Sequence, residues 1–344
     1  MKKIKIGILG PSDIAIRKTI VAIKNCDIFE YIGVAVATKE ERTFVINENN
    51  KANLDIDFQR GLLKAQEIKK HFGGKVYIGY ENFLNSNEIE AVYIALPPSL
   101  HYFWAKKALQ NGLHVFLEKP FTANLSQTIN LIDYAEENRL ALAENYAFVF
   151  HPQIAKIKEL INSNRIGSVQ FIKTNFGFPL ISFENFRYKK VYGGGALLDC
   201  GGYTIKLTQI FMKEMRIKNS MLFKQENSDV DIYGAITAVD NQNIVAQLCF
   251  SMNQEYKCEL EIIGSKGCIK AERIYTAPAN CATNVNIVNQ NKLETVKIDP
   301  FDQFKASLFE FAKMIRYNEC RIDSYNSILK QSKYIETCGV VINE

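Results

Sequence analysis

Three residues combine a reactive side chain with a setting that can direct it: Lys119, Asp199 and Tyr203. Lys119 lies between Glu118 and Pro120 at the end of an apolar stretch, and a residue before proline is held out of the helical region, so its ammonium group can be aimed. Asp199 and Tyr203 are four residues apart, which places them on one face of a helix. An ammonium group, a carboxylate and a phenol together can transfer protons. The alternative for Lys119 is an ordinary surface lysine.

Glycines surround the segment that carries Asp199 and Tyr203. Five of them lie between Gly193 and Gly202. Each glycine inside a helix costs roughly 1 kcal/mol of stability, so a helix with a purely structural role rarely carries so many. The glycines before the helix leave its start open to a closely approaching ligand. The pattern favours a functional site.

Two neighbouring strands are predicted to end in turns at the same edge of a sheet. Leu96-Pro97-Pro98 follows the apolar segment Ala91–Leu96, and Glu118-Lys119-Pro120 follows His114–Leu117. Ligands of open α/β sheets lie at the carboxyl ends of the strands. We therefore expect both turns at a ligand-binding edge, although a proline pair can also simply end a strand.

A turn near the amino end has the setting of a dinucleotide-binding turn. The segment from Gly10 to Ala15 follows the apolar alternation of Ile4–Leu9 and precedes isoleucines at helical spacing. In such a strand–turn–helix unit a pyrophosphate binds at the helix N-terminus. Only the first of three expected glycines is present, with Ser12 and Ala15 at the other two positions. Because many turns use a glycine only for its positive φ, this turn alone does not establish a cofactor site.

The elements that would position these residues alternate in type through the first 150 residues. Alternation of strands with amphipathic helices predicts an α/β domain with a doubly wound parallel sheet of the Rossmann type. A polar, aperiodic stretch at residues 40–60 predicts a long loop. The predicted strands are Ile4–Leu9, Tyr31–Thr38, Val76–Ile78, Ala91–Leu96, His114–Leu117 and Ala141–Asn145.

The second half of the chain has a different pattern. A helix at Pro152–Asn162 and a strand at Ser168–Phe176 precede several short strands between residues 216 and 298, which predicts a large, mostly antiparallel open sheet in an α+β domain. We expect a nucleotide-binding domain at residues 1–146 and a substrate-binding domain at 147–344. The last helices, from about residue 301, are expected to pack back on the first domain. An open sheet commonly packs against a partner, which predicts a homodimer or homotetramer.

Composition limits the class of ligand and the compartment. The 344 residues carry a net charge of +5 without basic runs, so nucleic acid is not indicated and a small anionic ligand is suitable. No apolar run reaches the roughly 18 to 20 residues of a membrane span, and the amino end does not resemble a signal peptide. Eight cysteines without a Cys-x-x-Cys pair and four dispersed histidines predict reduced thiols in a cytoplasmic protein and no metal site.

In combination these motifs resemble the Gfo/Idh/MocA family of NAD(P)-dependent sugar oxidoreductases. The resemblance covers nearly the whole chain, in the order Gly-x-Ser-x-x-Ala, Leu-Pro-Pro, Glu-Lys-Pro and Gly-Gly-Gly-Ala-Leu-Leu-Asp-x-Gly-x-Tyr. Many members carry histidine where this chain has Tyr203. Tyrosine is usual in the branch with dihydrodiol dehydrogenases, xylose dehydrogenases and sugar-nucleotide 3-ketoreductases. The segments Glu144-Asn145-Tyr146 and Arg187-Tyr188 are most similar to the 3-ketoreductases.

The resemblance implies roles for individual residues. Tyr203 would be the general acid and Lys119 its partner beside the nicotinamide, although the opposite assignment is open. Asp199 would bind a sugar hydroxyl or orient Lys119. The implied cofactor-binding residues are Gly10, Ser12, Asp13, Ile14, Thr38, Lys39, Leu96, Pro97, His101, Glu118 and Lys119. The implied substrate-binding residues are Asn145, Tyr146, Arg187, Tyr188 and Asp199.

The end of the second strand indicates the choice of cofactor. Thr38 and Lys39 supply a hydroxyl and a cation, which suit a ribose 2′-phosphate, so NADP(H) is favoured and NAD(H) is the alternative. Glu40 and Glu41 follow at once and count against a phosphate. The resulting hypothesis is an NADP(H)-dependent reductase of a nucleotide-linked 3-keto-hexose. The alternatives are a dehydrogenase of a free aldose or a trans-dihydrodiol, and a non-catalytic paralogue that binds the cofactor.

Overall fold

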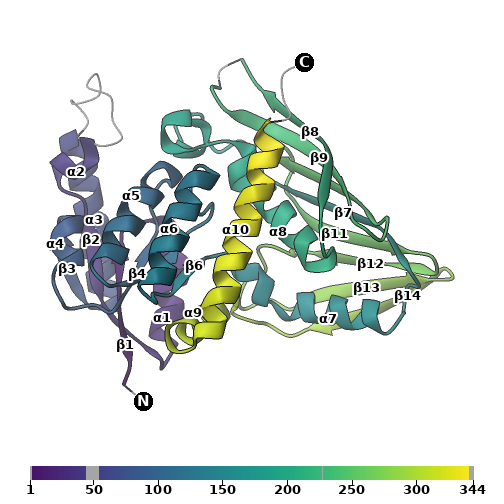
Figure 1. The fold of residues 1–344 in the computed structure, drawn as a ribbon, viewed down its shortest axis with the longest axis horizontal. Coiled ribbons are helices and arrows are strands. Elements are labelled where there is room, and N and C mark those ends of the chain that lie inside the picture. Colours follow the sequence, from purple (N-terminus) through teal and green to yellow (C-terminus); the bar gives the residue numbers. More distant parts are fainter. Residues whose placement is uncertain (1, 44–53, 227, 341–344) are drawn as a thin grey trace. The chain divides into compact units, whose positions relative to one another are not determined.

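The computed structural model describes residues 2–43, 54–226 and 228–340. They form two compact units, drawn in Figure 1. The first unit consists of Met1–Asn145 and Phe304–Lys330, and the second of Tyr146–Gln303 and Gln331–Glu344. The expected boundary after residue 146 lies one residue from the division at Asn145, and Phe304–Lys330, among the helices expected to pack back on the first domain, is grouped with the first unit. Among the described residues, no helix is long and apolar enough to cross a membrane.

The first unit is built on a six-stranded parallel sheet with the strand order β3-β2-β1-β4-β5-β6. This order puts the topological switch point between β1 and β4, where open α/β sheets bind their ligands. The predicted doubly wound parallel sheet is confirmed. The strands are β1 Ile4–Leu9, β2 Phe29–Val36, β3 Lys75–Ile78, β4 Ala91–Ile94, β5 His114–Leu117 and β6 Leu142–Glu144.

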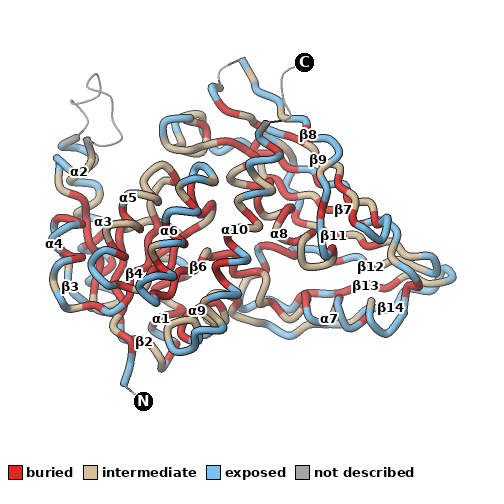
Figure 2. Tube along the Cα trace, viewed as in Figure 1, coloured by how far each residue is buried: buried red, intermediate tan, exposed pale blue. Residues whose placement is uncertain are grey.

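Helices cover both faces of this sheet, so that the central strand β4 is buried on each side (Figure 2). Val92 belongs to one apolar core with Trp104, and Tyr93 belongs to the other with Phe311. This alternation follows from the period of two in a strand. The helices of this unit are α1 Ile20–Lys24, α2 Lys39–Thr43, α3 Leu54–Phe72, α4 Tyr80–Leu84, α5 Pro98–Gln110, α6 Leu125–Glu137, α9 Gln303–Arg316 and the first part of α10 Asn318–Val340.

The prediction of a loop over residues 40–60 is wrong at both ends of that stretch. Residues 40–43 lie in α2, and α3 begins at Leu54. Polar residues at an exposed helix surface give no apolar period, which is why the sequence pattern missed them. The part of the stretch between these helices lies outside the described residues.

The second unit is built on an eight-stranded sheet with the order β14-β13-β12-β11-β7-β10-β9-β8. Only the pairing of β7 with β10 is parallel among the pairings described, so the prediction of a mostly antiparallel sheet is confirmed. The strands are β7 Val169–Gly177, β8 Arg216–Lys224, β9 Asp231–Val239, β10 Val245–Ser251, β11 Lys257–Gly264, β12 Gly267–Glu272, β13 Thr283–Asn289 and β14 Lys292–Ile298.

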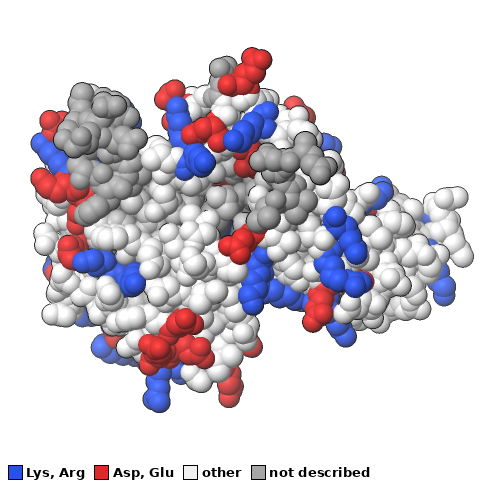
Figure 3. Space-filling model, turned by 45° about the horizontal axis from the view of Figure 1, so that its top comes forward, with Lys and Arg blue, Asp and Glu red and all other residues white. Residues whose placement is uncertain are grey.

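One face of this second sheet forms the core of the unit, with α7 Pro152–Asn162, a π-helical turn at Leu197–Gly201 and α8 Gly202–Phe211. Burial alternates along β9 and β10, as expected for a sheet with one buried and one more exposed face. On the surface that Figure 3 shows, basic and acidic side chains are interspersed, in agreement with the absence of basic runs in the sequence.

Candidate active site

The turn after β1 is shaped by Gly10. Its φ is +87°, and a Cβ on it would lie 2.6 Å from Leu96 Cδ2 and 3.3 Å from the carbonyl oxygen of Ala95. Ser12 Oγ accepts a hydrogen bond from the Ala15 N–H (3.2 Å) and so begins the following helix. A backbone cradle that a side chain would fill is what the close approach of a dinucleotide pyrophosphate requires. This turn fits such a cofactor.

Two other residues of this turn contribute in different ways. Asp13 is exposed and pairs with Lys64 of α3, with 2.8 Å between Asp13 Oδ1 and Lys64 Nζ. Ile14 packs against the apolar core on that side of the sheet. The Asp13 carboxylate therefore has a cation beside it, which lessens its repulsion of a phosphate.

The carboxylate of Glu41, which follows the end of β2, is engaged by backbone N–H groups. Its Oε2 accepts hydrogen bonds from the N–H groups of Thr38 (2.8 Å) and Tyr80 (2.9 Å), and its Oε1 accepts one from the Glu81 N–H (2.9 Å). Thr38 Oγ1 in turn accepts a hydrogen bond from the Glu41 N–H, which completes a capping box. Glu41 therefore ties two loops together and is not placed as a ribose-binding acid.

Two cations adjoin Thr38. Lys39 is exposed and forms an ion pair with Asp55, whose hydrogen bond and charge raise the pKa of Lys39. Arg42 lies over Gly61 of α3, where a Cβ would be 2.6 Å from Arg42 Nη2, and its Nε is buried without a hydrogen-bond partner in the described ranges. Sequence reasoning missed Arg42, although its spacing of three residues from Lys39 on a helix was a usable signal.

His101 connects the turns that follow β4 and β5. Its Nδ1 lies 2.8 Å from the carbonyl oxygen of Pro120, and its Nε2 lies 2.8 Å from that of Leu96. Burial lowers the pKa of His101. Both ring nitrogens are therefore engaged by backbone, and His101 holds the turn of Pro97 against the turn of Lys119. We had expected it to bind the cofactor directly.

Glu118, the residue before Lys119, is buried in a polar cluster. Its Oε1 accepts hydrogen bonds from Tyr93 Oη (2.5 Å) and from Asn145 Nδ2 (2.7 Å). Burial raises the pKa of Glu118, and Lys119 opposes this effect with its charge. Glu118 was expected to bind the cofactor and Asn145 the substrate, but their side chains are hydrogen-bonded to each other. Lys119 itself is half-buried beyond the end of β5.

In the second unit, the start of the glycine-rich helix is held by Asp231 of β9. Its Oδ2 accepts a hydrogen bond from the Leu197 N–H (2.6 Å). Gly195 has a φ of +126°, and a Cβ on it would lie 2.4 Å from Asp231 Oδ1. Burial raises the pKa of the Asp231 carboxyl. Asp231 therefore fixes the helix that carries Asp199 and Tyr203, a role that sequence spacing could not reveal.

Arg187 and Asp199 form an ion pair inside the second unit. Arg187 Nε donates to Asp199 Oδ2 (3.1 Å), and Arg187 Nη1 donates to Asn185 Oδ1 (3.3 Å). Burial opposes the charge of Arg187, but Asp199 outweighs it and raises the pKa of the guanidinium. Tyr203 also interacts with that group. Three residues predicted for the site, Arg187, Asp199 and Tyr203, therefore interact with one another.

Aromatic rings enclose Tyr203, which is itself half-buried. Its ring centroid lies 5.1 Å from that of Tyr146, at an interplanar angle of 86°, and 4.9 Å from that of Phe176. Tyr146 is buried, and its hydroxyl accepts a hydrogen bond from Gln331 Nε2 (3.3 Å). Tyr188 is also buried and donates to the carbonyl oxygen of Met252 (2.7 Å). The structure therefore places Tyr188 in the core of this unit.

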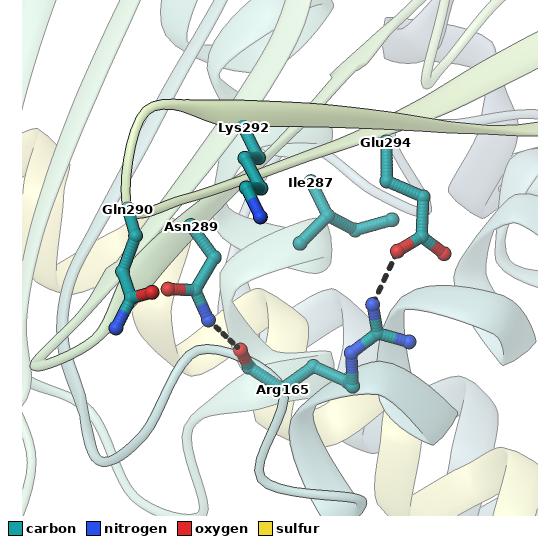
Figure 4. A pocket seen from close by; sticks show the side chains of 6 residues that line it. All are labelled: Arg165, Ile287, Asn289, Gln290, Lys292 and Glu294. Carbon is teal, nitrogen blue, oxygen red and sulfur yellow. Dashed lines mark hydrogen bonds and ion pairs between the residues drawn. The ribbon is translucent and has the colours of Figure 1, made fainter.

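A surface cavity of about 270 Å³ lies beside the β13–β14 hairpin, and none of the six residues that line it is a predicted site residue (Figure 4). Arg165 pairs with Glu294 there, and Asn289 Nδ2 donates to the Arg165 carbonyl oxygen (3.2 Å). The Arg165 guanidinium is thus already paired with an acid, and Lys292 is a second cation in the lining. Within residues 2–43, 54–226 and 228–340, no group of three or more His, Cys, Asp or Glu side chains could hold a metal ion.

Comparison with protein-family models identifies both halves of the chain. Residues 30–146 match the Gfo/Idh/MocA oxidoreductase family with an NAD-binding Rossmann fold. Residues 154–270 match the Gfo/Idh/MocA C-terminal domain.

Similar proteins match over nearly the full length. A dTDP-3,4-didehydro-2,6-dideoxy-alpha-D-glucose 3-reductase from Streptomyces violaceoruber is 31% identical, over 92% of this chain and 86% of its own. A D-xylose 1-dehydrogenase (NADP(+)) from Haloferax volcanii is 24% identical, over 94% of this chain and 92% of its own. The crystal structure of KijD10, a 3-ketoreductase from Actinomadura kijaniata in complex with NADP and TDP-benzene, has a TM-score of 0.89 and 28% identity, with coverage of 99% and 98%. This chain belongs to the Gfo/Idh/MocA family of oxidoreductases.

Proposed function

We propose that the protein is a ketoreductase that uses NADPH to reduce the 3-keto group of a nucleotide-linked deoxysugar. The observation that carries this proposal is the agreement of both units with KijD10, whose crystal structure holds NADP and TDP-benzene. The 3-reductase from Streptomyces violaceoruber supports the same substrate class at 31% identity. A net charge of +5 suits a substrate and a cofactor that both carry phosphates.

NADP(H) is the proposed cofactor, with NAD(H) as the alternative. Thr38, Lys39 and Arg42 offer a hydroxyl and two cations for a 2′-phosphate, and Glu41 is engaged by backbone N–H groups. The phosphate would replace Asp55 as the partner of Lys39. A bidentate guanidinium is the stronger phosphate ligand, so we assign the larger share of the preference to Arg42.

The proposed proton chemistry uses residues of both units. The bound nicotinamide supplies a hydride to the carbonyl carbon. Tyr203 then gives its phenolic proton to the carbonyl oxygen, which becomes the alcohol. Lys119 polarises that oxygen and stabilises the phenolate left on Tyr203. Arg187 holds Asp199, so that the Asp199 carboxylate can accept a hydrogen bond from a sugar hydroxyl.

The decisive assay compares the two directions of reaction. Consumption of NADPH with a dTDP-linked 3-keto sugar is expected, with no reduction of NADP by free xylose or glucose. Tyr203→Phe and Lys119→Ala should abolish turnover while NADP affinity stays nearly unchanged. Tyr325→Phe is a matched control, because the Tyr325 hydroxyl is buried and donates to the Leu140 carbonyl oxygen. Turnover of free xylose in place of the keto sugar would favour the aldose dehydrogenase.

We also propose a homo-oligomer in which a second copy covers the more exposed face of the eight-stranded sheet. Phe223 of β8 stacks on Tyr233 of β9 with 5.0 Å between ring centroids, and both rings are exposed, as is Phe171 of β7. Light scattering of the purified protein tests the proposed homo-oligomer, and a monomer at micromolar concentration would contradict it.

The eight cysteines form no disulfides, which supports a reducing compartment such as the cytoplasm.

A further inference from the structure

We propose that Gln331 is a positioning residue that fixes both the backbone and the ring of Tyr203. The inference rests on the proposed function, because that function makes Tyr203 the proton donor. Gln331 lies in the part of α10 that belongs to the second unit, and its side chain is fully buried. It acts through Tyr203 rather than on the substrate.

The first contact of Gln331 is with the peptide group directly before Tyr203. Gln331 Nε2 donates to the carbonyl oxygen of Gly202 at 2.8 Å. At Gly202 the π-helical turn Leu197–Gly201 changes into the α-helix α8. Single π-helical turns inside α-helices are rare and frequently occur at functional sites. The Gln331 amide therefore holds the helix where its pitch changes, one residue before the phenol.

The second contact of Gln331 is with the aromatic ring that packs on Tyr203. Gln331 Nε2 also donates to Tyr146 Oη, at 3.3 Å. The rings of Tyr146 and Tyr203 meet edge to face, with 5.1 Å between their centroids and an interplanar angle of 86°. This arrangement is a favoured one for aromatic pairs. One amide group thus reaches Tyr203 by two routes, through its backbone and through its ring.

The same contacts explain why residue 202 is a glycine. Its φ is −55°, an ordinary helical value, so the backbone conformation does not require glycine. A Cβ on Gly202 would lie 2.3 Å from Tyr146 Oη and 3.6 Å from Gln331 Nε2. Because glycine has no side chain, the Tyr146 hydroxyl can approach the helix backbone closely enough for Gln331 to bond both groups.

Gln209 of α8 determines which way the Gln331 amide faces. Gln209 Nε2 donates to Gln331 Oε1. A donor at that oxygen directs Gln331 Nε2 toward the Gly202 carbonyl oxygen and Tyr146 Oη. With the amide reversed, two oxygens would face each other at Gly202 and two N–H groups at Gln209. Gln331 therefore bonds α8 at two residues of the same helix, with its donor at the end that carries Tyr203.

The chain offers a matched pair of substitutions. Methionine is similar in length to glutamine, and its sulfur is only a weak acceptor, so Gln331→Met removes the hydrogen bonds and keeps most of the packing. Gln153→Met is the control. Gln153 is also fully buried in the second unit, and its Nε2 donates to a backbone carbonyl oxygen, that of Glu272 (3.1 Å). Both substitutions remove a buried amide donor, but only the first removes one bonded next to Tyr203.

The first measurement uses the protein without cofactor or substrate. With 3-fluorotyrosine in place of Tyr203, the ¹⁹F resonance reports the surroundings of that ring. In Gln331→Met we expect this resonance to move by more than its linewidth, whereas in Gln153→Met it should stay in place. Gln209→Met, which removes the donor that orients the Gln331 amide, should move it in the same direction by less.

The second measurement is the single-turnover rate constant for reduction of the keto sugar, with active enzyme in saturating excess. This constant does not depend on the fraction of the enzyme that folds, so a merely structural role would leave it unchanged. In Gln331→Met it should fall about ten- to a hundredfold, because misplacing a reacting group by ~1 Å can cost about a hundredfold in rate. In Gln153→Met it should be unchanged.

The outcomes separate this inference from the proposed function. A ¹⁹F resonance that stays in place in Gln331→Met, or in Gln209→Met if the first variant does not fold, overturns the role of Gln331. Equal shifts in Gln331→Met and Gln153→Met overturn it as well. A shift confined to Gln331→Met and Gln209→Met in a protein that does not reduce keto sugars refutes the proposed function alone. With an active enzyme, an unchanged single-turnover rate constant in Gln331→Met would leave Gln331 a structural role and refute the positioning role.

Discussion

Replacing Gly195 by alanine should be among the more damaging single-methyl changes in this chain. The residue has a φ of +126°, and the new Cβ would lie 2.4 Å from Asp231 Oδ1. Asp231 cannot yield freely, because its other oxygen accepts the Leu197 N–H at the start of the helix that carries Tyr203. The substitution therefore strains the backbone and breaks the contact that holds this helix.

The expected loss of stability has two parts. A non-glycine residue in that conformation costs about 1–3 kcal/mol. Losing a hydrogen bond to a charged acceptor costs a further ~1.5–3 kcal/mol. For Gly195→Ala we expect a total of about 2.5–6 kcal/mol, and a large loss of kcat because the helix bearing Asp199 and Tyr203 shifts.

Urea unfolding followed by pulsed hydrogen exchange and mass spectrometry measures this cost separately for each unit. Gly112→Ala is the matched control, since Gly112 also has a positive φ (+72°) but no atom within 4 Å of an added Cβ. For Gly112→Ala only the cost of the left-handed backbone conformation applies, which is roughly 1–2 kcal/mol. In an Asp231→Ala background the cost of Gly195→Ala should fall by about 1.5–3 kcal/mol, the coupling energy of the pair. Equal costs for the two glycine variants, or additive effects of Gly195→Ala and Asp231→Ala, would refute this reasoning.

Three further expectations concern other parts of the molecule. Burial lowers the pKa values of His114 and His151 to about 4, and the Nδ1 of each accepts a hydrogen bond from a backbone N–H. The stability that these neutral rings contribute above pH 6.5 should therefore be lost as the pH falls toward 4, by about 2 kcal/mol at pH 5 for His114. A melting temperature that does not fall between pH 6.5 and pH 4 would contradict this expectation. Glu41→Ala should cost about 2–4 kcal/mol in urea unfolding, because three backbone N–H groups lose their acceptor, while Glu67→Ala, at an exposed position of α3, should stay within ~0.5 kcal/mol. Arg187→Lys should raise the KM for the keto sugar about tenfold with the KM for NADPH unchanged, and equal changes in both would speak against a substrate-side role.

The fold was predictable where one local pattern decides it. The strand His114–Leu117 and the helix Pro152–Asn162 have the predicted bounds, because apolar runs and a proline at the first helical turn mark their ends. Residues 54–60 were missed because their helix lies on the surface, and Ile56 is 57% exposed. The last helices are expected to pack back on the first domain, and Phe304–Lys330 is grouped with the first unit, where Phe311 stacks on Phe116.

The site was predictable in its residue types and less so in their orientations. Spacing alone put Asp199 and Tyr203 on one helical face, and Arg187 does join them. Tyr188 has a suitable side chain for a sugar site, but its hydroxyl is bonded to a carbonyl oxygen in the core. Asn145 likewise donates a hydrogen bond to Glu118 within the first unit. A sequence motif specifies which groups are present, whereas their bonding depends on strands that meet only in the folded chain.

Carboxylates illustrate why this difference matters for an anionic ligand. By sequence, Glu41 follows Lys39 and counts against a phosphate there, whereas Glu118 is expected to bind the cofactor. In the structure Glu41 accepts three backbone N–H groups, and Glu118 accepts Tyr93 and Asn145. Each acid stabilises a loop or strand end while its charge is met by donors pointing at it. Glu41, which counts against phosphate binding in the sequence, thus helps to hold the backbone around the proposed site, and Glu118 does so in place of the direct cofactor contact expected of it.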